Sequence, residues 1–474
     1  MRILLIPPLL FLPLLTIISQ GIKIQGSEIS KKIQMEDNKM QYKVEQKGKV
    51  IPFKTKTYQL KNGLKVTFVN LPQSGLFAYY TAMRVGSRDE VEPGHSGFAH
   101  LFEHMMFRGT KNLPGAAYDN AVTAMGADSS AWTWNDQTVY FFVAPPDRLP
   151  KVVEMEAERF KNLFYSEAEF KTESGAVLGE YNKNFSNPVN KLEEALFDTA
   201  FTRHTYKHTT MGFLEDIKAM PRMYNYSLQF FKRHYVPSKA LIFVAGTFDE
   251  NQALKLIEKN YGDWEGEGWE TNPPVEPPQN SQKKVHIDWK SPVLPMMLLG
   301  YKIPAYSTEN KISASIVIAG ELLFGKASAL YEKLVLKEQC IESIDYWDWQ
   351  QRDPGLFIVE VVLKEPNFEY VISSIDEEIK KISEGNIETK AVEDAISHYK
   401  YNMLLNMDTA KNIARNLAFY ATLDGDPMSL DKFLQRIEEV SKEDVMNAAI
   451  NILKSTRRTI ATLSFKKSAQ EEKR

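Results

Sequence analysis

The chain has 474 residues, of which 43% are hydrophobic and 25% charged, a composition typical of a globular protein too long for one hydrophobic core. Its formal net charge of −3 carries no basic bias, so no nucleic-acid partner is expected. The single cysteine, Cys340, excludes an intrachain disulfide and a metal site built from several thiolates.

The N-terminal residues 1–19 consist of a basic start and an apolar run, in which Pro7, Pro8 and Pro13 disfavour a stable membrane-spanning helix. The pattern predicts a secretory signal peptide and an exported chain that faces the periplasm or the outside of the cell. Because no clear small-residue cleavage site follows, an uncleaved N-terminal membrane anchor is the alternative. No other segment is expected to cross a membrane. Residues 20–50 are rich in Lys and Gln and predict a flexible polar spacer.

Residues 51–264 are expected to form a first domain of strands and helices. Two strand-like runs flank Asn62-Gly63 within residues 58–69, which is a strong hairpin signal. Another strand is expected near residues 78–85, and a loop then leads into a predicted helix.

This helix carries His100, Glu103 and His104 in the order H-x-x-E-H. Positions i and i+4 lie on one face of a helix, so the two imidazoles can hold one zinc ion. Glu103 borders that face and can act as base for a water molecule whose pKa the metal lowers. The order is that of the inverzincin motif.

Glu180 is the candidate for a third ligand, on a later helix that is expected to start at Ser166 with Glu169 as its capping-box partner. Glu173 precedes Glu180 by two helical turns and shares its face, so it is expected to orient a ligand or the base. The alternative for both residues is an ordinary solvated carboxylate on a helix surface.

These residues resemble the pitrilysin family of zinc metallopeptidases, which includes the mitochondrial processing peptidases. The stretch 97–110 is similar to the family's motif helix and its exit, and weaker similarity continues to about residue 465. The resemblance implies a zinc metalloendopeptidase that cleaves extended peptides or small unfolded proteins. One zinc ion per chain would be held by His100, His104 and Glu180, and water activated by Glu103 would be the nucleophile.

The resemblance also assigns a role to Ser130, Ala131, Trp132 and Thr133. The matching family segment is an edge strand beside the metal, which pairs with the extended backbone of the substrate. The family usually has Asn where this chain has Ser130, which leaves fine specificity open. The alternative is an ordinary sheet edge.

A second histidine pair, His204 and His208, has the same i, i+4 spacing. No carboxylate accompanies it at a suitable place, and the matching family segment is a loop near the site. No metal is therefore expected there.

Residues 265–283 predict a linker, and residues 284–474 repeat the order of elements of the first half. The helix that corresponds to the motif helix carries no ligand. The predicted fold is therefore α+β, with two similar domains, each a mostly antiparallel sheet packed with helices, and a metal site in the first only. Family C-terminal domains supply an Arg and a Tyr that hold the substrate; the pattern does not place this pair, for which Arg352 and Tyr346 are candidates.

Chains of this size in the family pair to close a chamber around a peptide. A homodimer, or a heterodimer with a sister chain, is therefore expected. Because the substrate-holding pair is not placed, one alternative is a catalytic subunit that needs the sister chain for activity. The others are a noncatalytic subunit for peptide binding or assembly, and an exported protein that stores zinc or binds peptides.

Overall fold

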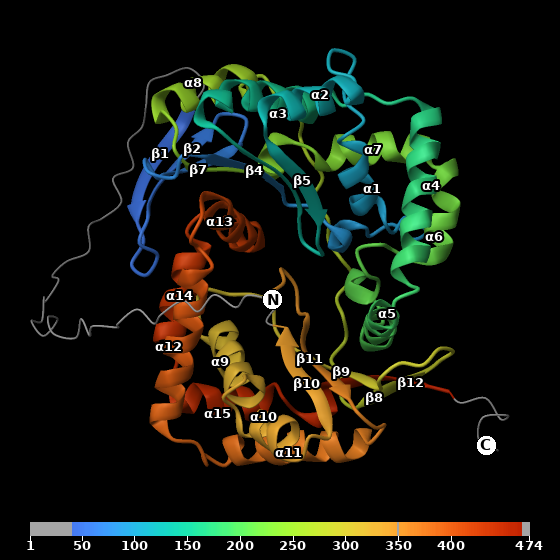
Figure 1. Cartoon of the computed structure of the whole chain (residues 1–474). Coiled ribbons are helices and arrows are strands. Elements are labelled where there is room, and N and C mark those ends of the chain that lie inside the picture. The colour runs from blue at the N-terminus through green and yellow to red at the C-terminus, as the bar shows by residue number, and fades with distance from the viewer. Residues whose placement is uncertain (1–39, 348–349, 467–474) are drawn as a thin grey trace, which may run out of the picture.

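The computed structural model describes residues 40–347 and 350–466. The predicted signal peptide or anchor, residues 1–19, and the spacer up to residue 39 lie outside these ranges. The described chain builds two sheets, one from each half, and helices pack on both (Figure 1). The predicted fold class, α+β with two similar domains of mostly antiparallel sheet, is confirmed.

The first sheet has seven strands within the described residues, in the order β1-β2-β3-β7-β4-β6-β5. The strands are β1 (Met40–Lys47), β2 (Lys54–Leu60), β3 (Lys65–Asn70), β4 (Phe77–Met83), β5 (Asp128–Thr133), β6 (Thr138–Ala144) and β7 (Ala240–Gly246). Neighbouring strands are antiparallel except for β3 and β7. The predicted Asn62-Gly63 turn joins β2 to β3, and Gly63 has the positive φ of 92° that this turn requires.

The second sheet repeats this topology with five strands in the described part of the chain. They are β8 (Lys283–Trp289), β9 (Met296–Lys302), β10 (Ile341–Trp347), β11 (Leu356–Leu363) and β12 (Arg458–Phe465). Their order β8-β12-β9-β11-β10 corresponds to β3-β7-β4-β6-β5, and in both sheets only the first of these pairs is parallel. The two halves are therefore copies of one architecture, in which edge strand β10 corresponds to β5.

The helices of each half lie between its strands in the chain, and α8 follows the last strand of the first half. Those of the first half are α1 (Phe98–Met105), α2 (Gly115–Met125), α3 (Leu149–Asn162), α4 (Glu167–Asn184), α5 (Pro188–Ala200), α6 (Leu214–Ala219), α7 (Tyr224–His234) and α8 (Glu250–Tyr261). Those of the second half are α9 (Ile312–Phe324), α10 (Ala329–Tyr331), α11 (Phe368–Ser383), α12 (Thr389–Leu405), α13 (Ala410–Asp424), α14 (Ser429–Glu438) and α15 (Lys442–Asn451).

Each half lends one helix to the sheet of the other half (Figure 1). Helix α13 of the second half packs on β4 and β7, where Leu417 shares a buried cluster with Tyr80 and Phe243. Helix α5 of the first half packs on β8, β9 and β12, where Leu196 shares a buried cluster with Leu298. Since β9 and β12 correspond to β4 and β7, the exchange is symmetric and the cores of the two halves interlock.

The predicted extent of the polar spacer is wrong at its C-terminal end. Residues 40–47 form β1, which pairs along β2 as the edge strand of the first sheet. Met40, Tyr42 and Val44 alternate with polar residues, and the Lys- and Gln-rich composition concealed this strand pattern. Just beyond β1, the backbone N–H groups of residues 49–51 donate to the carboxylate of Asp431 on α14 at 3.0, 2.8 and 2.9 Å, so the second half also holds this segment.

Within the described residues, one helical stretch, Ile312–Lys337, is long and apolar enough to cross a membrane by length and composition, with a mean hydropathy of 1.4. In the fold, 61% of the 18-residue segment of this stretch that meets the test is buried. Its first part, α9, contributes Ile316 and Ile318 to the core of the second half. Burial in a protein core accounts for this apolar composition.

Candidate metal centre

Helix α1 begins directly after Gly97, whose φ of 89° favours glycine. Glu90 replaces the missing side-chain cap by accepting hydrogen bonds from the N–H groups of Gly97 and Ala99 at 2.8 and 2.7 Å. Burial raises the pKa of Glu90 to about 8, although these two hydrogen bonds oppose the shift. The N-terminus of the helix that carries the motif is thus held by a buried carboxyl group.

His100 and His104 of α1 converge with Glu180 of α4. Their Nε2 atoms lie 3.6 and 3.3 Å from Oε2 of Glu180. The potential ligand atoms of the three residues all lie within 4.8 Å of one another, and no other group of at least three His, Cys, Asp or Glu side chains in the described chain meets this spacing. Both helices are therefore placed to present their ligands to one ion.

The chemistry of these donors fits zinc. Burial, reinforced by the nearby His104, lowers the pKa of His100 to about 4, so this imidazole is neutral at pH 7 and keeps a lone pair for a metal. Two imidazoles and one carboxylate are a ligand set found in catalytic zinc sites, where one coordination position remains open.

Glu173 lies behind His104. Its Oε2 is 3.4 Å from Nδ1 of His104, and its Oε1 accepts a hydrogen bond from Arg108. The hydrogen bond to Glu173 raises the pKa of His104 and leaves the other ring nitrogen, Nε2, directed at Glu180. Glu173 is only 3% exposed, so it is not the solvated carboxylate of the alternative interpretation.

Glu103 is held by the edge strand and not by the ligands. Oγ1 of Thr133 donates a hydrogen bond to Oε2 of Glu103 at 2.7 Å. Burial raises the pKa of Glu103, and the hydrogen bond from Thr133 opposes this shift. A carboxyl group whose pKa is raised takes up a proton more readily than an ordinary glutamate, as a general base that later acts as an acid requires.

Strand β5 pairs with β6 along one side only in the described chain, and its other side is a free edge. Ala131 packs towards the core beneath α1, whereas Trp132 packs towards the cluster that includes α13. Trp132 and Thr133 line a cavity of about 320 Å³ together with His100, Glu103 and Glu180. Ser130 and Ala131 are outside this lining.

The same cavity has walls that the sequence analysis did not anticipate. They are Trp134, Asn135, Asn184, Phe185, Asn190, Glu193, Phe197, Thr209, Thr210 and Met211. Asn184 stands four residues after Glu180 on α4 and donates a hydrogen bond to its Oε1 at 3.5 Å, so helical spacing could have identified it. The others come from α5 and from loops that no local pattern connects to α1.

The two candidates for holding the substrate lie elsewhere. Nη1 of Arg352 is 3.7 Å from Oδ2 of Asp89, where the two halves meet. The hydroxyl of Tyr346 donates to Glu321 at 2.8 Å. Neither side chain lines the cavity. Arg352 instead contacts the first half, and Tyr346 contacts α9 of its own half.

The second histidine pair is divided between two partners. Nε2 of His204 lies 3.0 Å from Oδ2 of Asp353, and Nε2 of His208 lies 3.7 Å from Oε2 of Glu90. Both imidazoles are buried; His204 contacts the second half, whereas His208 contacts the loop that precedes α1.

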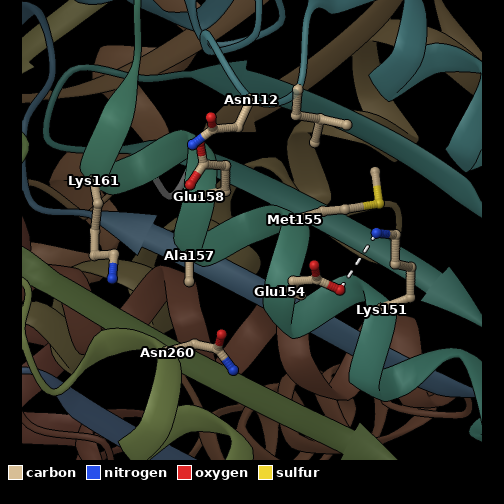
Figure 2. A pocket seen from close by; sticks show the side chains of 9 residues that line it. Asn112, Lys151, Glu154, Met155, Ala157, Glu158, Lys161 and Asn260 are labelled. Atoms are coloured by element: carbon tan, nitrogen blue, oxygen red, sulfur yellow. Dashed lines mark hydrogen bonds and ion pairs between the residues drawn. The ribbon is translucent and has the colours of Figure 1, made fainter.

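A second cavity, of about 290 Å³, lies on the outer helical layer at α3 and α8 (Figure 2). Lys151 and Glu154 form an ion pair of 3.3 Å in its wall, and Asn112, Glu158 and Asn260 supply further polar groups. None of the residues that line it is a histidine or a cysteine, so it offers no comparable metal site.

Comparison with known proteins agrees with this geometry. Residues 80–213 match the family model described as insulinase (peptidase family M16), and residues 224–399 match the model described as the peptidase M16 inactive domain. The chain belongs to the M16 peptidase family. The resemblance inferred from the motif residues, to the zinc peptidases of the pitrilysin type, is thereby confirmed.

This M16 chain is 27% identical over 430 residues to the zinc protease PqqE of Helicobacter pylori, covering 86% of the chain and 93% of that protein. It is 25% identical over 419 residues to the β subunit of the mitochondrial processing peptidase of Mus musculus, covering 85% and 83%. The crystal structure of a protease from Helicobacter pylori aligns with a TM-score of 0.79 at 27% identity, covering 86% and 99%. The relatives support a zinc metallopeptidase of the M16 family.

Proposed function

We propose that this M16 chain is a zinc-dependent metalloendopeptidase that hydrolyses extended peptides or small unfolded proteins. The observation that carries the proposal is the convergence of His100, His104 and Glu180 within 4.8 Å, with Glu103 in the same cavity. The relatives that are named zinc proteases support the same reaction class.

His100, His104 and Glu180 would hold one zinc ion, because zinc binds imidazole nitrogens and carboxylate oxygens. When bound, zinc supplies a Lewis acid that lowers the pKa of water and polarises a peptide carbonyl. Glu103, held by Thr133, takes the proton from the attacking water and later returns a proton to the leaving amine. Glu173 positions His104 through Nδ1 and thereby fixes its tautomer.

The free edge of β5 supports an extended peptide as substrate. Backbone groups on an unpaired edge can form a ladder with any extended chain, largely irrespective of its side chains. Such a ladder would carry the scissile bond past Thr133 and the neighbouring Glu103. A folded protein could not present its backbone in this way, so the proposal is limited to unfolded or short substrates.

The test combines zinc analysis with cleavage of an unstructured fluorogenic peptide. The purified chain should contain one zinc ion, and Glu103→Gln should keep the zinc and lose about 10²–10⁴-fold in activity. Glu154→Gln, on the outer face, is the matched control and should behave like the parent (Figure 2). An active Glu103→Gln variant, or a parent chain that binds no zinc, would contradict the proposal.

We also propose that the active form is a dimer, either of two copies or with a sister chain. All the residues that line the cavity in the described chain lie between residues 100 and 211, so the second half contributes none of them. The mouse relative is itself named a subunit. If a second chain completes the chamber, specific activity will rise with protein concentration in step with the mass measured by light scattering. Constant specific activity from a monomer would contradict dimerisation, whereas zinc without cleavage at any concentration would favour a chain that needs a sister subunit or only binds peptides.

Export of the chain is a proposal that rests on residues 1–19. One structural neighbour is described as a periplasmic protease, at 20% identity. Cell fractionation followed by intact-mass measurement will show whether the protein is exported and whether this segment is removed, and recovery of the full-length chain in the cytoplasm would contradict the proposal.

A further inference from the structure

Arg415, on α13 of the second half, lies beside the edge strand of the first half. Its guanidinium carbon is 5.6 Å from the ring centroid of Trp132, and its side chain is exposed. Trp132 belongs to β5 and lines the cavity together with the candidate metal ligands His100 and Glu180. Helix exchange between the halves therefore brings a cation to the strand on which the substrate is proposed to bind.

In the described part of the chain, the positive charge of Arg415 has no carboxylate partner. Among the described residues, no carboxylate lies within ion-pair distance of its guanidinium. Lys411, one turn earlier on α13, differs in this respect, because its Nζ lies 2.7 Å from Oδ2 of Asp128. Asp128, the acidic group of β5, is thus engaged by Lys411, and Arg415 retains its capacity to bind an anion.

Tyr80 adds an unused hydroxyl beneath this surface. Its ring lies 5.9 Å from that of Trp132, the residue is fully buried, and its hydroxyl has no hydrogen-bond partner in the described structure. Arg415 and Asp128 are the charged groups close enough to influence its pKa, which burial raises. Leaving a buried polar group without a partner is unfavourable, so an acceptor that reached this hydroxyl would gain a hydrogen bond.

The side chains of an extended peptide alternate between the two faces of the sheet that it joins. On the free edge of β5, one set would face α1 and the metal ligands, and the other set would pass Trp132 and Arg415. A guanidinium that lies over an aromatic ring keeps its N–H groups available for a carboxylate.

We propose that Arg415, together with Trp132 and Tyr80, forms a subsite for an Asp or Glu side chain of a peptide bound on β5. This inference rests on the proposed peptidase function, because it takes β5 as the substrate strand. It gives the M16 chain a substrate preference that is set by the second half, although that half lines no part of the metal cavity.

The test separates binding from turnover. Zinc-loaded Glu103→Gln chain is titrated with fluorescent peptides that differ only in having Glu, Gln or Lys at one scanned position, and affinity is read from anisotropy. At the position that faces α13, the Glu peptide should bind about 10-fold more tightly than the Lys peptide. Adding Arg415→Glu should reverse this order, and Arg415→Lys should preserve its direction. Tyr80→Phe should weaken binding of the Glu peptide and leave that of the Lys peptide unchanged.

Arg222→Glu is the matched control, because Arg222 is also exposed and lies outside the cavity lining. It should keep the preference of the parent. Equal affinities for the Glu and Lys peptides at every position, or an order that Arg415→Glu leaves unchanged, would overturn the inference, as would failure of all peptides to bind. Cleavage of the same peptides by the unmodified chain distinguishes the two proposals. Charge-selective binding without cleavage would contradict the peptidase function and support the subsite. Cleavage without any charge preference would support the peptidase function and contradict the subsite.

Discussion

Thr133 and Glu103 are joined by a hydrogen bond of 2.7 Å between Oγ1 and Oε2, although they belong to a strand and a helix that are 30 residues apart. The bond couples the edge strand to the proposed base. A peptide that pairs with β5 would therefore be aligned by the same strand that orients the carboxylate, and substrate position and base position would be set together.

Replacing Thr133 by Val removes the hydroxyl and keeps the branched shape of the side chain. Loss of one hydrogen bond that orients the base should lower kcat about 10-fold, since such bonds contribute about 1–1.5 kcal/mol. Zinc content should remain at the parent level, and Thr133→Ser should recover most of the rate. Steady-state kinetics on a fluorogenic peptide provide the measurement, and an unchanged kcat in the Val variant would show that Thr133 does not position Glu103.

Glu173 links His104 to Arg108, so its removal should loosen the imidazole rather than delete a ligand. Glu173→Ala should weaken zinc binding about 10–100-fold, as found for partners of metal-bound histidines. Glu173→Gln retains an acceptor for Nδ1–H and should lose less. Competition with a fluorescent chelator gives the affinity, and Glu167→Ala, at the exposed start of the same helix, is the control. Parent-like affinity in Glu173→Ala would assign Glu173 to the fold alone.

The candidate metal ligands could be predicted from the sequence because their strongest signal, the spacing of residues on a helix, is local. His100 and His104 share one helix face, and helical spacing relates Glu173 to Glu180. The face of β5 on which each side chain lies depends on strand register. The family resemblance therefore suggested substrate pairing for Thr133, but nothing in the sequence showed that its hydroxyl holds Glu103.

The exchange of α5 and α13 could not be predicted because it consists of contacts between distant segments. Lys411 and Asp128, for example, are separated by 283 positions. Hydrophobic periodicity shows that a helix has a buried face but not which sheet covers it. The same reason explains why the position of Arg352 could not be predicted. The resemblance offered it as a substrate residue, but it lies next to Asp89 of the other half.

The interlocked cores predict that the two halves unfold together. Leu196 of α5 is fully buried against the second sheet, and Leu196→Ala should cost about 2–5 kcal/mol. Because α5 follows the helix that carries Glu180 after a turn of only three residues, 185–187, calorimetry should show one transition that moves as a whole to lower temperature. Leu228→Ala, at an exposed position of α7, should change the melting temperature little. Two transitions, of which only one responds to Leu196→Ala, would show that the halves are independent.

Asp353 predicts a pH-dependent link between the halves. Burial alone would raise the pKa of this carboxyl group, but hydrogen bonds from His204 and Arg88 outweigh burial and lower the pKa from its ordinary value of 3.8 to about 2. Since the folded-state pKa is the lower one, the ionised form stabilises the fold above about pH 4, and this contribution is lost as the pH falls towards 2. The side chain is 25% exposed, so after screening we expect a contribution of about 1–2 kcal/mol.

Asp353→Asn should therefore be less stable than the parent at pH 7, and the difference should shrink between about pH 4 and pH 2. Urea unfolding of both proteins at a series of pH values measures this difference. A constant offset can remain, because Arg88 and His204 lose a partner at every pH, and the pH-dependent part is the one that reports on Asp353. Asp198→Asn, which alters a surface ion pair with Lys207, should show no such change. A stability difference that stays constant down to pH 2, or that grows as the pH falls, would show that the contacts with His204 and Arg88 do not stabilise the ionised carboxylate.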